Sequence, residues 1–287
     1  MTPLGLGDAS VDCRIVVGVC VLAFVGCTSD DIEAPDAQPS DIANEVINAP
    51  PEDVTTDAPS GAASDGLSEP DEPLNYDFGT RADAGSVRAG VIQDAGGLLG
   101  GPKREGKVGD IRMDNAHVAF IIAGARPSSG YSYWGANVID ASAWREGVGF
   151  APDYFGELFL AWNLDVFRPE SVEVVDDGQV SGRAHVRFRG RTDVFHFAQA
   201  ALGAIVNLDP PNMALTYDYI LGPDDEALTL KISFENDTSS NYYMEWPLLM
   251  SNSGDGVFNY VPGHGFADLN GEPLPYFGLS GRRVAYA

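Results

Sequence analysis

The sequence predicts a mainly-β protein, an antiparallel β-sandwich of the supersandwich type with one short helix, preceded by a disordered linker. Three observations carry this prediction: side chains alternate with a period of two through Leu215–Asn236, strand-like runs recur between turn residues, and residues 28–80 carry an acidic, aromatic-poor composition. An alternating pattern indicates a strand with one buried and one solvated face. A lone hairpin is marginal in water, so the buried faces need a second layer.

The central hairpin has two arms joined by a loop that contains Gly222 and Pro223. The first arm alternates from Leu215 to Leu221, and the second alternates from Leu228 to Phe234. Antiparallel arms joined by a short loop with Gly and Pro form a β-hairpin. We therefore expect this pair of strands at the centre of the sheet.

Further strands are expected on both sides of this hairpin, and one helix interrupts them. Pro210–Pro211 ends the helical spacing, and Asp114–Asn115 is expected to form the turn of a second hairpin. The expected strands are Ser86–Gln93, Val108–Met113, Ala116–Ile122, Asn137–Ser142, Ser171–Val175, Arg183–Arg189, Tyr242–Met250 and Arg282–Tyr286, and Tyr154–Asn163 fits a buried strand or a short helix. The helix is expected in Val194–Leu208, where Phe197, Ala201, Ile205 and Leu208 recur with helical spacing.

The N-terminus resembles an export signal of the lipoprotein type. Arg14 precedes the apolar run Ile15–Phe24, which is shorter than the roughly 20 residues of a membrane-spanning helix. The run ends in Phe24–Cys27, which resembles a bacterial lipobox, although Phe24 stands where Leu is usual. We expect residues 1–27 to be the signal peptide and Cys27 to be the acylated residue, with cleavage of an ordinary signal nearby as the alternative.

Charge and cysteine content divide the remaining chain into a linker and a folded body. The formal net charge is -25, and no Lys or Arg occurs between Cys27 and Arg81. Residues 28–80 carry too little apolar surface to offset the entropy of ordering, so we expect a disordered tether. Residues 81–287 form the expected sandwich domain. They contain no Cys, so the core must hold together without disulfides.

One loop carries aromatic residues in a polar context. Residues 125–137 are rich in Ser, Gly and Pro and contain Tyr131, Tyr133 and Trp134. Flat rings with polar tips suit carbohydrate or peptide recognition, because they contact a ligand at low entropic cost. The three rings are therefore the candidate ligand-binding residues, and closure of one end of the sandwich is the alternative.

Other chemistry has less support. An acidic chain disfavours nucleic acid as a partner. The basic stripe Arg183, His185, Arg187 and Arg189 is expected to pair with acidic neighbours on a solvated strand face, with an anionic sugar as the alternative. The four histidines are His117, His185, His196 and His264, and none has metal-ligand spacing. No catalytic residue, metal site or cofactor is predicted, and the sequence leans away from an enzyme.

The body resembles two kinds of β-sandwich. Residues 217–226, 228–236 and 245–249 are similar in pattern to galactose-mutarotase-like domains, which occur in sugar epimerases and as non-catalytic modules of polysaccharide-degrading enzymes. Residues 101–122 resemble the N-terminal sandwich that precedes a PHP-type metallohydrolase domain in exported bacterial proteins. No segment matches the H-x-H signature of that hydrolase domain, so the chain is expected to be the front part of a longer protein if this resemblance holds.

Taken together, these features predict a lipid-anchored protein of the cell envelope, on the outer membrane, in the periplasm or facing the surface. Its expected role is non-catalytic binding, with carbohydrate as the ligand. Two alternatives are a carbohydrate enzyme of the mutarotase or polysaccharide-lyase type and a structural envelope lipoprotein without a small ligand. The enzyme would bring His117, His196 or His264 together with a carboxylate in one cleft.

Overall fold

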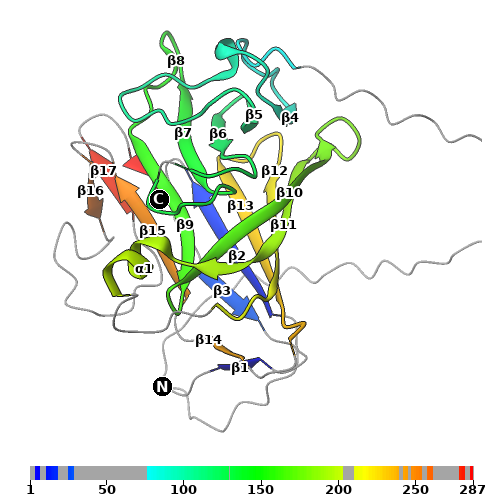
Figure 1. The fold of residues 1–287 in the computed structure, drawn as a ribbon. Helices are drawn as coiled ribbons and strands as arrows, with labels where there is room; N and C mark the ends of the chain where they lie inside the picture. Colours follow the sequence, from blue (N-terminus) through cyan, green and yellow to red (C-terminus); the bar gives the residue numbers. More distant parts are fainter. Residues whose placement is uncertain are drawn as a thin grey trace, which may run out of the picture. The chain divides into compact units, whose positions relative to one another are not determined.

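The computed structural model describes residues 76–128, 130–202 and 210–238, except for the side chains of residues 198, 201 and 202. It also describes the backbone of strands before and after this region (Figure 1). The linker prediction lies outside the described residues over residues 29–75. Tyr76 and Phe78 already belong to the body: the Tyr76 hydroxyl donates to Asp177 Oδ2 at 2.8 Å, and Phe78 is 4% exposed.

Thirteen strands form one antiparallel sheet. Its main path runs in the order β3-β2-β13-β12-β11-β10-β9-β7-β6-β5-β4, and β15 and β8 pair with β9 and β7. Two smaller sheets pair β1 with β14 and β17 with both β16 and β18. The strands of all three sheets are β1 Leu4–Leu6, β2 Val11–Gly18, β3 Val25–Thr28, β4 Val87–Val91, β5 Ile111–Asn115, β6 Val118–Ile122, β7 Val138–Arg145, β8 Gly149–Phe150, β9 Phe155–Trp162, β10 Asp165–Asp177, β11 Ala184–Val194, β12 Ala214–Leu221, β13 Ala227–Glu235, β14 Tyr242–Met244, β15 Pro247–Ser253, β16 Val257–Tyr260, β17 Gly278–Gly281 and β18 Ala285–Tyr286.

The central hairpin is confirmed as β12 and β13. The strands pair antiparallel with Tyr217 opposite Ile232 and Tyr219 opposite Leu230. Burial alternates along β13, where Leu228, Leu230, Ile232 and Phe234 are buried, as the period of two predicts. The hairpin therefore presents one apolar face to the core.

One large hydrophobic cluster joins strands from distant parts of the sheet. β4, β5 and β6 contribute Ala89, Met113 and Phe120, and β11 and β12 contribute Phe188 and Tyr217 to the same cluster. β4 also contacts β10 and β11, although it lies at the end of the strand order. The two layers of the expected sandwich are thus supplied by one sheet that bends around its core, which confirms the mainly-β antiparallel fold.

The predicted turn of the β5–β6 hairpin is wrong by two residues. Asp114 and Asn115 belong to β5 and are fully buried, and the turn lies at Ala116 and His117. The Asn115 side chain accepts hydrogen bonds from the backbone N–H groups of His117 and Val118, at 2.8 and 2.9 Å. Asn115 therefore stabilises the turn from its edge, because its side chain competes for local backbone donors.

The helix prediction is confirmed in part. Helix α1 spans His196–Leu202, while Val194 ends β11 and residues 203–209 lie outside the described part of the chain. Phe197, the first of the four residues with helical spacing, has a side chain that is 62% exposed. Tyr154–Asn163 resolves as the fully buried strand β9 rather than a helix.

Strands near both ends of the chain pair with strands of the large sheet. β2 pairs with β13 and β3 pairs with β2, both antiparallel. The strand expected in Tyr242–Met250 is split before Pro247, which opens β15 and pairs with Trp162 of β9. Pro is tolerated as the first residue of a strand, because it lacks the N–H that an interior position would donate. Among the described residues, no helix has the length and apolar character needed to cross a membrane.

Candidate functional site

The three candidate rings lie on the loop between β6 and β7. Backbone hydrogen bonds close this loop on itself, from Ser128 N to Tyr133 O at 2.6 Å and from Gly135 N to Arg126 O at 2.9 Å. At the end of the loop, the buried hydroxyl of Tyr219 in β12 donates to Ala136 O at 2.7 Å. The core of the sheet therefore positions the end of the aromatic loop.

The carboxylate of Glu157, buried on β9, holds the tip of the loop. Its Oε2 accepts from Tyr131 N at 2.7 Å and Ser132 N at 3.4 Å, and its Oε1 accepts from Asn137 Nδ2 at 3.1 Å. Burial raises the pKa of Glu157 to about 7, while the backbone donors act in the opposite direction. A Cβ on Gly130 would overlap the carboxylate of Glu157, so a larger residue here would have to displace the group that holds the loop.

Helix α1 brings two further rings to the loop. The ring of Tyr133 stacks on His196 with centroids 4.6 Å apart, and Tyr131 meets Phe197 edge-on at 6.3 Å. Exposed fractions are 53% for Tyr131, 42% for Tyr133 and 62% for Phe197. We call Tyr131, Tyr133, Trp134 and Phe197 the aromatic surface.

Trp134 differs from the other three rings, because it is anchored. Its Nε1 donates to Asp193 Oδ2 at 3.0 Å, and the Arg168 guanidinium lies 5.9 Å from its ring centroid. The ring also packs against a small buried cluster that includes Phe159 and Phe195. Trp134 therefore forms the half-buried base of the aromatic surface.

The sequence reasoning missed Phe197 and His196. Both occur directly after β11, and an exposed aromatic residue at the start of a short helix was the available signal. In the sequence, the spacing of Phe197 indicated only that it belongs to the helix. The position of α1 beside the loop depends on tertiary contacts between the helix and the loop, and the spacing of residues along the chain does not predict such contacts.

The basic stripe on β11 is confirmed as a strand face paired with acidic neighbours. His185 Nε2 and Arg187 Nε lie 2.7 and 2.6 Å from Asp218 Oδ1. Arg189 pairs with Glu173 at 2.9 Å, and Arg183 pairs with Asp225 at 3.2 Å. The basic side chains of the stripe are therefore already bound to carboxylates of the protein, and we do not assign an anionic ligand to them.

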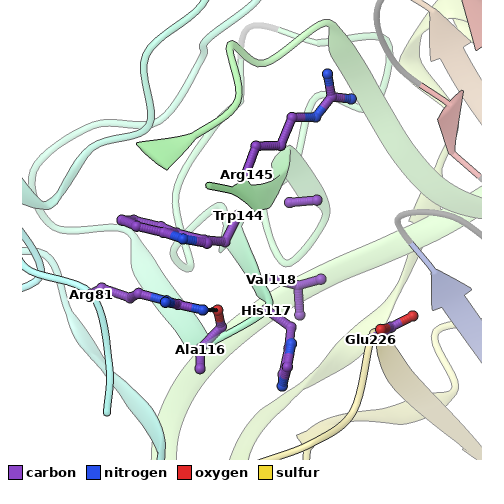
Figure 2. Close-up of a pocket in the computed structure, with 8 residues that line it drawn as sticks. Arg81, Ala116, His117, Val118, Trp144, Arg145 and Glu226 are labelled. Carbon is purple, nitrogen blue, oxygen red and sulfur yellow. Dashed lines mark hydrogen bonds between the residues drawn. The ribbon is translucent and has the colours of Figure 1, made fainter. Parts of the chain in front are cut away.

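A separate pocket lies at another part of the body and has a volume of about 280 Å³ (Figure 2). We call it the Arg81 pocket. It is lined by Arg81, Ala116, His117, Val118, Ala143, Trp144, Arg145 and Glu226. Arg81 precedes β4, His117 lies in the β5–β6 turn, and Glu226 lies in the β12–β13 loop. His117 therefore shares a pocket with a carboxylate, which is the convergence that the enzymatic alternative requires.

The other histidines give no such arrangement in the described part of the chain. His185 is paired with Asp218 in the stripe, and His196 stacks on Tyr133. His264 lies outside the described residues. Within the described ranges, no group of three or more His, Cys, Asp and Glu side chains is placed to hold a metal ion.

Buried carboxylates line the inner side of the body near β7 and β9. Asp153 Oδ1 accepts from Ala141 N and Phe155 N at 3.2 and 3.0 Å, and Asp140 accepts from the backbone N–H groups of Glu105 and Gly106. Burial raises the pKa of Asp140 to about 6. Burial, followed by the charge of Asp140, raises the pKa of Asp153 to about 8. These groups hold backbone segments in place, and Asp153 with Glu157 is not arranged as a catalytic pair open to substrate.

Comparison of the chain with protein families, with curated proteins and with solved structures found no match. The findings therefore establish a mainly-β domain built on an antiparallel sheet, and the site residues rest on their geometry alone.

Proposed function

We propose that this chain is a lipid-anchored binding module of the cell envelope that takes carbohydrate on the aromatic surface. One observation carries the proposal: Tyr131, Tyr133 and Phe197 converge from a loop and a helix, and all three remain exposed.

The chemistry of the aromatic surface suits sugar rings. A pyranose has an apolar face of C–H groups that packs against an aromatic ring, and its hydroxyl groups bond to polar groups at the edge. Tyr131 and Tyr133 provide both a ring and a hydroxyl. Glu157 and Tyr219 fix the loop beneath them, so little conformational entropy is lost when a ligand binds.

Alanine substitutions on the aromatic surface test this proposal. We expect Tyr131→Ala with Phe197→Ala to weaken binding to a polysaccharide by at least about tenfold, because stacking on two exposed rings is lost; tenfold corresponds to about 1.4 kcal/mol. A glycan array should first identify the ligand, and titration calorimetry should then compare the variant with the wild type.

Val180→Ala provides the matched control, because Val180 is 91% exposed on the β10–β11 connection and belongs to no ring cluster. It should bind as the wild type does. Unchanged affinity in the double variant, or no glycan bound by the wild-type protein, would rule out the aromatic surface as a carbohydrate site. The second result would favour the structural lipoprotein.

The anchor is proposed on the lipobox-like segment that ends at Cys27. We expect the mature protein to begin at Cys27 with acyl groups attached, and Cys27→Ser to release the protein from the membrane fraction. Intact-mass analysis of the mature protein measures both the N-terminus and the lipid. A mature N-terminus elsewhere, or a Cys27 without acyl groups, would contradict the anchor while leaving the binding proposal intact.

Cleavage at this position has a structural consequence. β2 and the first two residues of β3 precede Cys27, and β2 is the neighbour of β13 in the full chain. Processing would therefore remove the strand that pairs with β13. The full chain and the mature protein should differ at this edge of the sheet.

A further inference from the structure

The Arg81 guanidinium borders the pocket without an acidic partner among the described residues, whereas most of the described arginines have one. Eight other arginines of residues 76–128, 130–202 and 210–238 form ion pairs: Arg88, Arg112, Arg126, Arg168, Arg183, Arg187, Arg189 and Arg191. Within the same residues, the Arg81 guanidinium has no carboxylate within ion-pair distance. In a chain with a formal net charge of -25, such a guanidinium beside a pocket is available to an external anion.

The guanidinium of Arg81 is nevertheless fixed in place. Its Nε and Nη2 donate to Ala116 O at 2.9 and 2.6 Å, and its central carbon lies 4.5 Å from the ring centroid of Trp144. Figure 2 shows the guanidinium and the indole lying against each other on one wall. These contacts leave Nη1 without a partner among the described residues. Because the group is held before a ligand arrives, an anion meets a donor whose orientation is already set.

Asn115 ties the two sides of the pocket together. Its Nδ2 donates to Gly222 O and Asp225 O of the β12–β13 loop at 2.8 and 2.7 Å, while its Oδ1 accepts from the β5–β6 turn. This buried side chain therefore fixes Glu226 relative to His117. Neither the imidazole of His117 nor the carboxylate of Glu226 has a hydrogen-bond partner among the residues that the structure describes.

We propose that the Arg81 pocket binds a small carboxylate that also carries hydroxyl groups, as a sugar acid does. Arg81 and the ring N–H of His117 bind the carboxylate, and Glu226 accepts from a hydroxyl. A volume of about 280 Å³ limits the ligand to roughly monosaccharide size, since pockets for larger ligands span about 300–1,000 Å³. Figure 2 shows the Arg145 side chain extending away from His117, so it is not assigned a role.

Binding of glucuronate, glucose and acetate to the full chain tests this inference. In titrations followed by NMR, we expect saturable binding of glucuronate, at least about tenfold weaker binding of glucose, which lacks the carboxylate, and weaker binding of acetate, which lacks the hydroxyls. Arg81→Gln should weaken glucuronate binding at least tenfold, because it removes the positive charge. Glutamine is chosen because its amide can still donate a hydrogen bond to Ala116 O. Glu226→Gln should reduce the difference in affinity between glucuronate and acetate, because Glu226 is proposed to accept a hydrogen bond from a hydroxyl that only glucuronate carries.

Arg104→Gln is the matched control, because Arg104 is exposed and outside the pocket. Should Arg81→Gln fail to fold, His117→Gln carries the test, since His117 is exposed and its loss should weaken glucuronate binding several-fold. Absence of saturable glucuronate binding, or equal binding by the wild type and the folded variants, would overturn the inference. Variants of the aromatic surface should leave glucuronate binding unchanged, which separates this site from the proposed function.

Discussion

Asp114→Ala is expected to lower the free energy of unfolding by about 3–5 kcal/mol, the range for breaking one side of a buried ion pair. Asp114 is fully buried and binds Arg112 at 2.7 Å, and Arg112 is only 2% exposed. It also binds Arg88 through both carboxylate oxygens, each at 2.8 Å. Removal of this carboxylate leaves the Arg112 guanidinium buried without a counter-charge.

The surroundings of Arg112 explain why it cannot escape to solvent. Its Nη1 donates to Gly97 O at 2.9 Å, and the guanidinium lies 5.3 Å from the Phe78 ring and 5.2 Å from the Phe150 ring. Burial lowers the pKa of Arg112, and the charge of Asp114 opposes this shift. Loss of Asp114 removes this compensation, so that burial and the charge of Arg88 both act against the charged form of Arg112.

Urea unfolding of the wild type and the variant measures the effect. Glu173→Ala is the matched control, because it breaks the exposed Arg189–Glu173 pair, for which about 0–1 kcal/mol is expected. Equal losses in the two variants would contradict the central role of Asp114 in the body.

Stability is expected to fall as the pH rises from 5 to 8, and Asp153→Asn should remove part of this dependence. The pKa of Asp153 is raised from 3.8 to about 8 by burial, so the folded protein holds the proton more tightly than the unfolded chain. Its contribution is complete below about pH 4 and is lost as the pH rises through about 8. One such group changes the unfolding free energy by up to about 1.4 kcal/mol per pH unit.

Asparagine suits position 153, because its side-chain oxygen can still accept the hydrogen bonds that Asp153 Oδ1 accepts. Asp153 Oδ1 accepts two backbone hydrogen bonds, whereas the buried Oδ2 has no hydrogen-bond partner in the structure. The variant should therefore gain stability relative to the wild type as the pH increases. Asp140 and Glu157, whose pKa values are also raised, should leave a smaller residual dependence.

Unfolding free energies at pH 5, 6.5 and 8 test this expectation. Asp224→Asn removes an exposed carboxylate and should follow the wild-type curve. Parallel curves for the wild type and Asp153→Asn would show that Asp153 is ionised in the folded state throughout this range.

Patterns in the sequence located most of the strands but not their arrangement. The alternation in Leu228–Phe234 correctly predicted a buried face, because successive side chains of a strand point to opposite faces of the sheet. Asp114 and Asn115 were mistaken for turn residues, because the same polar side chains that favour turns also serve buried pairs and caps. Local composition does not distinguish these two uses.

The candidate sites show the same division. Tyr131, Tyr133 and Trp134 were identified on their loop, since rings in a Ser- and Gly-rich segment stand out by composition alone. Phe197 joins them through the packing of α1, and the Arg81 pocket combines residues separated by more than a hundred positions in the chain. Neither grouping follows from spacing.

The sequence by itself determined the mainly-β character, the alternating faces of the central hairpin, the acidic and cysteine-poor composition, and the aromatic loop. These properties follow from composition or from the order of residues close together in the chain, where the geometry of the backbone decides which way the side chains point. Only the tertiary structure decided that one bent sheet encloses the core, that Glu157 supports the loop, and that Arg81 has no acidic partner among the described residues. Such features depend on which distant residues meet when apolar faces are buried together, and that choice is made by the whole chain.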